Sequence, residues 1–383
     1  MCESTMRPWE TQVPSRMLMG PGPSNAYPRV LAAMTLPLLG HLHPPFVKIM
    51  DEIKQGLQYL AQTESPYAMA VSGSGHAGME ASIANVLEPG DKIIVGNNGI
   101  WGSRVVDLSG RYGAQVISLD KEGGQTYSLE ELTSAIEKHK PQALFLCQGE
   151  SSAGTMQNLE GIGEVCKANN CLLIVDTVCT FAGVPFYFDN WGVDVMYSGS
   201  QKALSCPPGA APFIMSENAM RKLKNRKTPP ATYNLDMNLI GAYWGWFGNQ
   251  RFYHHTGPVS QFYALREGID IACEEGLENL WARHQAMHEY LWEGLTGLGL
   301  KPFVENPADR LPTVNTIKVP EGVDFAKVIA NAMDFYSLEI AGGLGPTVGK
   351  VWRIGVMGHN ARPLNMDMVI QAFRKGLEMQ GKL

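Results

Sequence analysis

Short apolar runs alternate with amphipathic segments between residues 67 and 215 of the chain. The apolar runs predict strands at 67–72, 93–95, 116–118, 143–147 and 172–175. Between them, apolar residues recur at helical spacing, which predicts helices over 76–87, up to about residue 112, 129–139 and 162–168. Strands that are apolar throughout are buried on both faces, so the alternation predicts parallel pairing with helices on both sides of a sheet.

The pattern differs on either side of this region. Helical spacing predicts a helix over about 45–61 and a long, interrupted helix from about 258 to beyond 289. After residue 300 the pattern predicts separated strands at 313–319 and 352–356 and helices at 324–336 and 365–379. We therefore expect an N-terminal arm at 1–16, a large domain at 17–275 and a smaller C-terminal α/β domain at 276–383.

The composition of the chain argues against nucleic acids and membranes as partners. The chain has 383 residues, of which 45% are hydrophobic and 18% are charged, and its formal net charge is −6. An acidic balance argues against a nucleic-acid partner, and the basic run at 221–227 is interpreted as a solvated helix face. No apolar stretch approaches the roughly 18 residues that a membrane span needs, so no membrane partner is expected.

Cysteine usage and the chain ends suggest an intracellular compartment. The seven cysteines form no C-x-x-C pair, which is typical of reduced thiols. The first twenty residues show no secretory or mitochondrial signal. Gly381-Lys382-Leu383 is a weak match to peroxisomal Ser-Lys-Leu tails, so we expect a peroxisomal or cytoplasmic protein, with the mitochondrion less favoured.

Two predicted strands end in groups that suit a single ligand. Asp176 closes the apolar run 171–175, and Lys202 follows the run 193–201, which ends in small residues. A lysine can hold the aldehyde of pyridoxal phosphate as a Schiff base, and an acid can keep the ring nitrogen protonated. Ligands of such sheets lie outside the carboxyl strand ends, so we expect the two residues to be neighbours. The alternatives are a helix cap or ribose contact for Asp176 and an exposed lysine for Lys202.

Further segments supply possible cofactor contacts. Ser72-Gly73-Ser74-Gly75-His76 joins a strand to a helix, and its glycines and free helix N–H groups suit a phosphate; the alternative is a tight turn without a ligand. Trp101 stands between glycines, so we expect its ring to be presented from a loop for stacking, unless it packs in the core. The hydroxyls of Ser151 and Ser152 could donate hydrogen bonds to the phenolate oxygen of the cofactor. The alternative is a loop in which these serines bind backbone groups of the loop itself.

A charged residue inside an apolar strand indicates a bound anion. Arg353 lies within Val351-Trp352-Arg353-Ile354-Gly355, where its guanidinium suits a carboxylate, although a structural ion pair is the alternative. No metal is expected: His254 and His255 should point in opposite directions on an extended chain, and neither they nor His41-x-His43 have a carboxylate pattern beside them.

Taken together, these motifs resemble the alanine–glyoxylate and serine–pyruvate aminotransferases, a branch of the class V, fold-type I pyridoxal phosphate enzymes. Insect 3-hydroxykynurenine transaminases are also similar. The resemblance runs from residue 18 to 355 and rests on Gly20-Pro21-Gly22-Pro23-Ser24-Asn25, Ser72-Gly73-Ser74-Gly75-His76, Gly99-Ile100-Trp101-Gly102, Gly149-Glu150-Ser151-Ser152, Ser198-Gly199-Ser200-Gln201-Lys202, Tyr253-His254-His255-Thr256, Gly342-Gly343-Leu344-Gly345-Pro346 and Arg353-Ile354-Gly355.

The resemblance implies a role for each matching residue. Lys202 would be the Schiff-base lysine and proton shuttle, Asp176 the partner of the ring nitrogen, and Trp101 the stacking residue. Further cofactor contacts would come from Ser74, Gly75, His76, Ser151, Val178 and Gln201, and from Tyr253 and Thr256 of a second subunit. Ser24, Asn25 and Arg353 would bind substrate. The family also implies a fold with a mostly parallel sheet between helices, and a homodimer with shared active sites.

Departures from the family pattern leave the substrate open. They occur at Ala153, at 177–183 around Thr180, and at Trp246-Phe247. We expect a ping-pong transamination from alanine or serine to glyoxylate or pyruvate. The alternatives are 3-hydroxykynurenine or kynurenine with glyoxylate, cysteine desulfuration on the same fold, and a non-catalytic cofactor-binding or structural protein.

Overall fold

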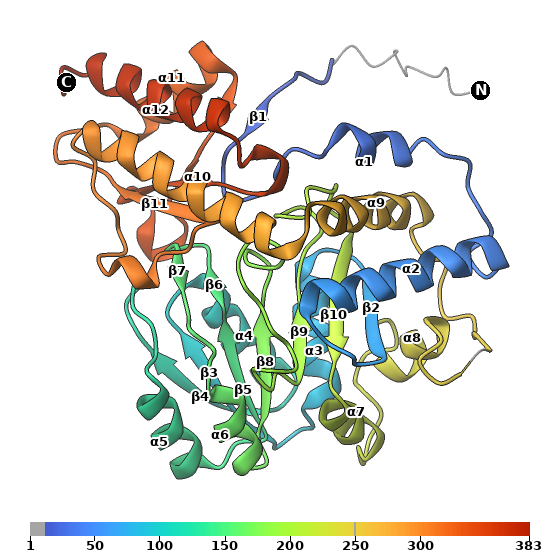
Figure 1. The fold of residues 1–383 in the computed structure, drawn as a ribbon. Coiled ribbons are helices and arrows are strands. Elements are labelled where there is room, and N and C mark those ends of the chain that lie inside the picture. The colour runs from blue at the N-terminus through green and yellow to red at the C-terminus, as the bar shows by residue number, and fades with distance from the viewer. Residues whose placement is uncertain (1–11, 249) are drawn as a thin grey trace, which may run out of the picture.

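A seven-stranded sheet forms the centre of the larger part of the protein (Figure 1). The computed structural model describes residues 12–248 and 250–383, so residues 1–11 of the predicted arm lie outside it. The strands follow the order β2-β10-β9-β8-β5-β3-β4. Their bounds are β2 (Tyr67–Ser72), β3 (Lys92–Asn97), β4 (Gln115–Asp120), β5 (Ala143–Cys147), β8 (Leu172–Asp176), β9 (Val195–Tyr197) and β10 (Ala210–Met215).

The sheet is parallel from β9 to β4, as the apolar runs predict, but one strand runs the other way. Strand β10 pairs antiparallel with both β9 and β2, so the expectation of parallel pairing up to residue 215 is wrong at this strand. The connection differs: a parallel return needs a long crossover, which residues 177–194 supply between β8 and β9, whereas the shorter segment 198–209, also without a helix, leads back antiparallel. The same helix-free segment contains Lys202.

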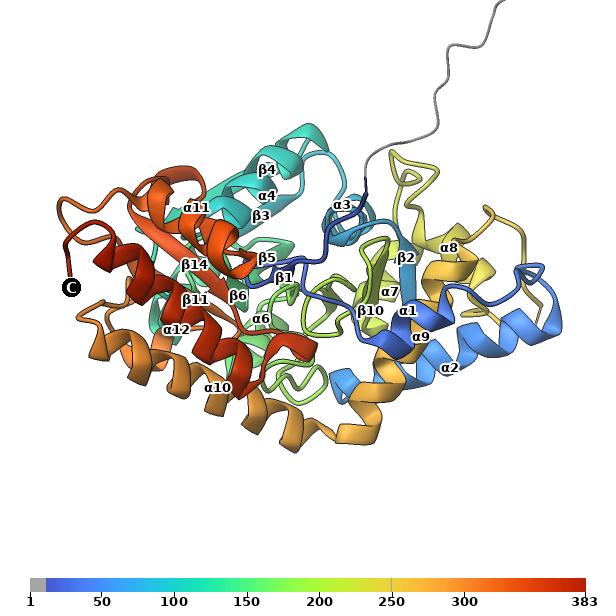
Figure 2. The same cartoon turned by 90° about the horizontal axis from the view of Figure 1, so that it is seen from above.

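Helices flank the sheet where the periodicity predicts them. Figure 2 shows α2 and α9 side by side. Strands β5, β9 and β10 are buried along their whole length, which places the core on both faces of the sheet. The helices are α1 (Pro28–Ala33), α2 (Pro44–Ala61), α3 (Gly75–Val86), α4 (Ile100–Arg111), α5 (Leu129–His139), α6 (Ile162–Ala168), α7 (Glu217–Lys224), α8 (Met237–Tyr243) and α9 (Val259–Glu275).

A second hydrophobic core lies under the C-terminal helices. Trp352 and Phe373 are fully buried there with ring centroids 5.3 Å apart. The elements are α10 (Leu277–Gly297), β11 (Val314–Lys318), α11 (Phe325–Tyr336), β12 (Leu338–Glu339), β13 (Ala341–Gly342), β14 (Val351–Gly355) and α12 (Pro363–Glu378), with β14 between β11 and β13. Strand β1 (Met17–Leu18) pairs with β12, which joins the N-terminal segment to this core.

The predicted long helix consists of α9 and α10, which are separated at Gly276, where φ is +81°. The exact domain boundaries stay a prediction. In the described parts of the chain, no helix has the length and apolar character needed to cross a membrane.

We expect acid to weaken the contact between α10 and residue 358. His284 is fully buried; its Nδ1 lies 2.7 Å from the Leu280 carbonyl, and its Nε2 accepts a hydrogen bond from the Gly358 N–H at 2.9 Å. The ring must therefore be neutral, and burial lowers its pKa from 6.5 to about 4. The unfolded chain then binds a proton that the folded chain does not, so stability is lost as pH falls from about 6.5 toward about 4.

The measurement is urea unfolding of wild type and His284→Gln across this pH window. We expect the wild type to lose roughly 3 kcal/mol more of its free energy of unfolding than the variant. His43→Gln, which changes an exposed histidine, is the control. Parallel curves for wild type and His284→Gln would contradict the prediction.

Candidate active site

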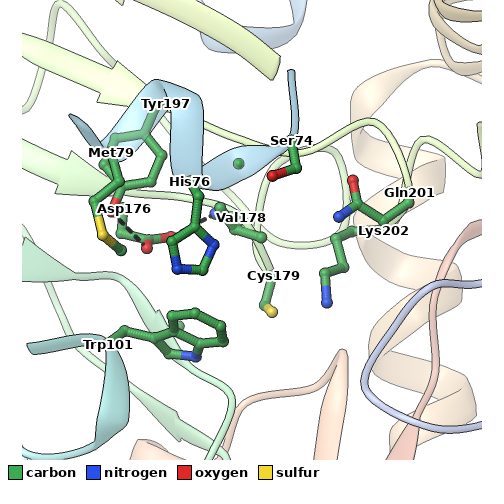
Figure 3. A pocket seen from close by; sticks show the side chains of 12 residues that line it. Ser74, His76, Met79, Trp101, Asp176, Val178, Cys179, Tyr197, Gln201 and Lys202 are labelled. Atoms are coloured by element: carbon green, nitrogen blue, oxygen red, sulfur yellow. Dashed lines mark hydrogen bonds between the residues drawn. The ribbon is translucent and has the colours of Figure 1, made fainter. Parts of the chain in front are cut away.

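A pocket opens beyond the carboxyl ends of β8 and β9, beside the N-terminus of α3 (Figure 3). The structure brings together many of the predicted residues in its lining: Ser74, Gly75, His76, Trp101, Asp176, Val178, Gln201 and Lys202. It adds residues that were not predicted: Met79, Gly149, Cys179 and Tyr197. Strand ends that are far apart in sequence therefore supply one site.

Asp176 is a buried acid held by two donors. The Val178 N–H donates to its Oδ1 at 2.8 Å, and the Tyr197 hydroxyl donates to its Oδ2 at 2.7 Å. Burial raises the pKa of Asp176 to about 6, while these two hydrogen bonds lower it. The carboxylate is thus fixed in orientation at the floor of the pocket.

Lys202 reaches the pocket from the loop after β9, and the N-terminal segment closes over it. Its Nζ donates to the Pro21 carbonyl. A Cβ at Gly22, where φ is +114°, would overlap the Lys202 side chain, so a glycine is needed there. The Ser24 hydroxyl donates to the Lys202 carbonyl at 2.7 Å. Residues 21–24 therefore set where the amine points.

The other N-terminal candidate binds protein groups. The Asn25 side chain accepts from the Leu18 N–H at 2.8 Å and donates to the Arg16 carbonyl at 2.9 Å. In this structure Ser24 and Asn25 hold the segment in place, and their contact with substrate stays a prediction.

The N-terminus of α3 suits an anion. Ser74 is the residue before the helix, and its side chain makes no capping hydrogen bond. The first N–H groups of the helix therefore lack that common partner. His76 contacts Arg104 through Nε2, and burial, followed by the Arg104 charge, lowers the pKa of His76. The Gln201 Oε1 atom is buried without a hydrogen-bond partner in the described chain, so the amide can turn toward a ligand.

Trp101 is positioned by a helix and not by a loop, which corrects the expectation from its flanking glycines. It lies in the first turn of α4, where its backbone is fixed by helical geometry. Its Nε1 donates to the Ser151 hydroxyl at 2.8 Å. The Arg104 guanidinium lies 4.8 Å from the indole centroid. The indole is therefore held at its N–H edge, while Ser151 lies outside the pocket lining.

Arg353 is buried on β14 and contacts backbone carbonyls. Its Nε donates to the Gly342 carbonyl at 2.8 Å and its Nη1 to the Ser151 carbonyl at 3.2 Å. Among the described residues no carboxylate forms an ion pair with it, so the alternative of a structural ion pair is wrong within them. Burial lowers the pKa of Arg353, and the charge of Glu150 opposes that effect.

Tyr253 and Thr256 lie outside the pocket of their own chain. Tyr253 is 65% exposed, and Thr256 is also exposed. Between them, the rings of His254 and His255 meet at an angle of 85° with Nδ1 atoms 2.8 Å apart, so the expectation that they point in opposite directions is wrong. The reason is the Ser72 hydroxyl, which lies 2.6 Å from His255 Nε2 and draws that ring inward.

No cluster of three or more metal-binding side chains occurs in residues 12–248 and 250–383.

One departure from the family pattern lies away from the pocket. Trp246 packs on Tyr67 with centroids 5.5 Å apart and donates to the Ala68 carbonyl at 3.2 Å. It does not line the pocket, so the expectation that it influences substrate choice loses its support.

Two of the pocket residues that were not predicted as site residues are Cys179 and Tyr197. Cys179 lines the pocket, beside Lys202 in Figure 3. Tyr197 was also missed, although its place at the end of β9, level with Asp176, was a usable signal.

The comparison with known families decides the class. Residues 18–352 match the family Aminotransferase class-V. The chain belongs to this family. It is an aminotransferase, and the resemblance inferred from its motifs is confirmed.

Similar proteins span nearly the whole chain. Alanine–glyoxylate aminotransferase from Felis catus is 49% identical over 376 residues, 98% of this chain and 90% of that protein. The crystal structure of alanine–glyoxylate aminotransferase from Nostoc sp. has a TM-score of 0.95 and 49% identity, and covers 97% of this chain and 98% of its own. That of ureidoglycine–glyoxylate aminotransferase from Bacillus subtilis has a TM-score of 0.94 and 34% identity, with 97% and 95% covered. These likenesses confirm the predicted fold class.

Removal of the Tyr197 hydroxyl should raise the pKa of Asp176 above about 6, because its hydrogen bond stabilises the carboxylate. The measurement is a pH titration of the aspartate carboxyl carbons by ¹³C NMR in Tyr197→Phe, with Asp176→Asn used for assignment. Tyr263→Phe is the matched control, since that buried tyrosine donates to the Pro37 carbonyl instead. An unchanged Asp176 midpoint in Tyr197→Phe would refute the assigned contact.

Proposed function

We propose that this aminotransferase uses pyridoxal 5′-phosphate and moves the amino group of a small amino acid, alanine or serine, to glyoxylate or pyruvate in a ping-pong reaction. The observation that carries the proposal is the meeting of Lys202 and Asp176 in one pocket with the N-terminus of α3 and the Trp101 indole. Glyoxylate as acceptor is supported by the names of the relatives above, which differ in their amino donors.

The pocket residues fit this cofactor by their chemistry. The free N–H groups at α3, with Ser74, Gly75, His76 and Gln201, suit the phosphate. Trp101 and Val178 offer apolar surfaces to a flat ring, and Asp176 offers a carboxylate to a protonated ring nitrogen. Bound there, pyridoxal phosphate supplies an aldehyde that takes up amino groups and a ring that takes up electrons.

The chain's own residues would then bind the substrate and move its proton. Arg353 binds the α-carboxylate of the amino donor, because its buried guanidinium has no acidic partner among the described residues and its Nη2 makes no protein hydrogen bond there. Lys202, in its neutral form, removes the proton from Cα. The Pro21 carbonyl accepts a hydrogen bond from Nζ and so aims the amine. Asp176 stabilises positive charge on the ring nitrogen.

Cysteine desulfuration is a weaker alternative for this site. It needs a reactive, mobile cysteine, and Cys179 is the cysteine that lines the pocket. Burial raises the pKa of the Cys179 thiol, which keeps it protonated. The Thr313 hydroxyl donates to the Cys179 carbonyl and so fixes its backbone. These two facts favour amino transfer over attack by this thiol.

Replacement of Lys202 tests the catalytic assignment. We expect Lys202→Ala to lower kcat by about a hundredfold or more, because general base catalysis at Cα is lost. Lys202→Arg retains a charge without a titratable amine and should be equally slow. Lys222→Ala, at an ion pair on α7, is the control and should be fully active. Wild-type rates in Lys202→Ala would exclude this mechanism.

A donor screen with glyoxylate as acceptor tests the substrate class. We expect turnover of alanine and serine, and Arg353→Gln should raise KM for both by about tenfold to a hundredfold through loss of the charged hydrogen bonds to the carboxylate. Rapid turnover of 3-hydroxykynurenine alone would replace the proposed donors. An Arg353→Gln enzyme with unchanged KM would remove Arg353 from the substrate site.

We further propose a homodimer whose active sites are shared, with Tyr253 and Thr256 acting at the partner's pocket. The support is that both side chains are exposed and lie outside their own pocket. A Lys202→Ala chain and a Tyr253→Ala/Thr256→Ala chain should each be nearly inactive. Mixed after subunit exchange, they should recover about a quarter of wild-type activity, since half of the dimers then hold one intact site. No recovery in verified heterodimers would contradict sharing.

A further inference from the structure

A buried acid outside the pocket lining has no role in the chemistry above. Glu150 is 1% exposed and is the last residue of β6 (Gly149–Glu150). It begins the segment that leads into β7 (Thr155–Met156), residues 150–154, which we call the β6–β7 turn. Its Oε2 accepts from the Ser152 N–H at 3.0 Å, the Ser152 hydroxyl at 2.6 Å and the Ala153 N–H at 2.9 Å. Every one of these partners donates, so the site selects the ionised carboxylate even though burial raises its pKa.

The same carboxylate contacts the start of α4. Its Oε1 accepts from the Trp101 N–H at 3.3 Å. A Cβ at Gly99 would overlap the carboxyl group, although φ at Gly99 is 176°, an extended value that any residue can adopt. The glycine is therefore needed for space and not for backbone freedom. The pair of Gly99 and Glu150 lets an anion lie directly against the helix N-terminus.

Trp101 is consequently held at two points by consecutive residues. Glu150 binds its backbone N–H, and the Ser151 hydroxyl accepts from its indole Nε1 at 2.8 Å. Two contacts at opposite ends of the residue fix both the position and the tilt of the ring. A shift of the β6–β7 turn would therefore move the indole in the pocket.

The turn is also where the second core docks on the site. Three side chains from that part of the protein donate to its carbonyls: Arg353 to Ser151 at 3.2 Å, Thr347 to Ser152 at 3.2 Å and Thr316 to Ala153 at 2.6 Å. One short turn thus contacts the ring-facing Trp101 on one side and Arg353 on the other.

We propose that Glu150 is a positioning residue. Its carboxylate fixes the β6–β7 turn, and that turn fixes the positions of Trp101 and Arg353 relative to each other. This inference rests on the proposed function, because it assigns the ring to Trp101 and the substrate carboxylate to Arg353. In this assignment Glu150 contacts the Trp101 backbone but neither the cofactor ring nor the substrate carboxylate.

The test compares Glu150→Gln with wild type and with Glu160→Gln, the same change at an exposed glutamate between β7 and α6. Glutamine has nearly the shape of glutamate, but only one of its two end groups is an acceptor, because the NH₂ group can only donate; it therefore cannot accept on both the Trp101 side and the Ser152 side. We expect the dissociation constant for pyridoxal phosphate, measured by quenching of tryptophan emission, to rise about tenfold or more, and kcat to fall by about tenfold to a hundredfold. Trp101→Phe identifies the part of the quenching that belongs to Trp101.

A second variant keeps the result interpretable if Glu150→Gln folds poorly. Gly99→Ala should weaken cofactor binding by pushing the carboxylate away. The double variant Gly99→Ala/Glu150→Ala should lose less cofactor affinity than the two single variants lose together, because the alanine at 99 no longer overlaps a carboxyl group at 150.

Wild-type cofactor affinity and kcat in a folded Glu150→Gln protein would overturn the positioning role, as would strict additivity in the double variant. Failure of the proposed function has a different signature, since wild type itself would then lack transamination or Lys202→Ala would retain it.

Discussion

The pairing of β8 with β9 is the constraint on which the site depends. It places Asp176 level with Tyr197 at the carboxyl ends of two inner strands and lets the tyrosine hydroxyl donate to the acid at 2.7 Å. The chain then turns back through a helix-free segment into the antiparallel β10, and this turn contains Lys202. A buried acid and an amine thus line one pocket because two parallel strands end together and the next connection leads straight back antiparallel.

Closure of the pocket comes from chain segments that lie far away in the sequence. The Pro21 carbonyl and Gly22 fit around the Lys202 amine, and β1 beside them pairs with β12 under the second core. Arg353 reaches the β6–β7 turn from β14. The two cores therefore meet at the β6–β7 turn, beside the residue proposed to bind the substrate carboxylate.

The sequence predicted the sheet and helices well, because continuous apolar runs and helical periodicity are local signals. It also predicted which strand ends carry Asp176, Lys202 and the Ser74-Gly75-His76 turn. It failed where long-range packing decides: the direction of β10, the helical setting of Trp101, and the contact between His254 and His255, where the Ser72 hydroxyl of another element binds the His255 ring. Glu150 was passed over because its meaning depends on Gly99, fifty-one residues earlier, and contact between them is not visible in a local pattern.

The central claim is that the amine of Lys202 is the covalent anchor for pyridoxal phosphate. Its most direct test is reduction of the cofactor-loaded protein with borohydride, followed by digestion and mass spectrometry of the peptides. The account predicts that the mass of the reduced cofactor lies on Lys202 and that Lys202→Ala carries no such label. A label on another lysine, or no label in wild type that has taken up cofactor, would contradict it.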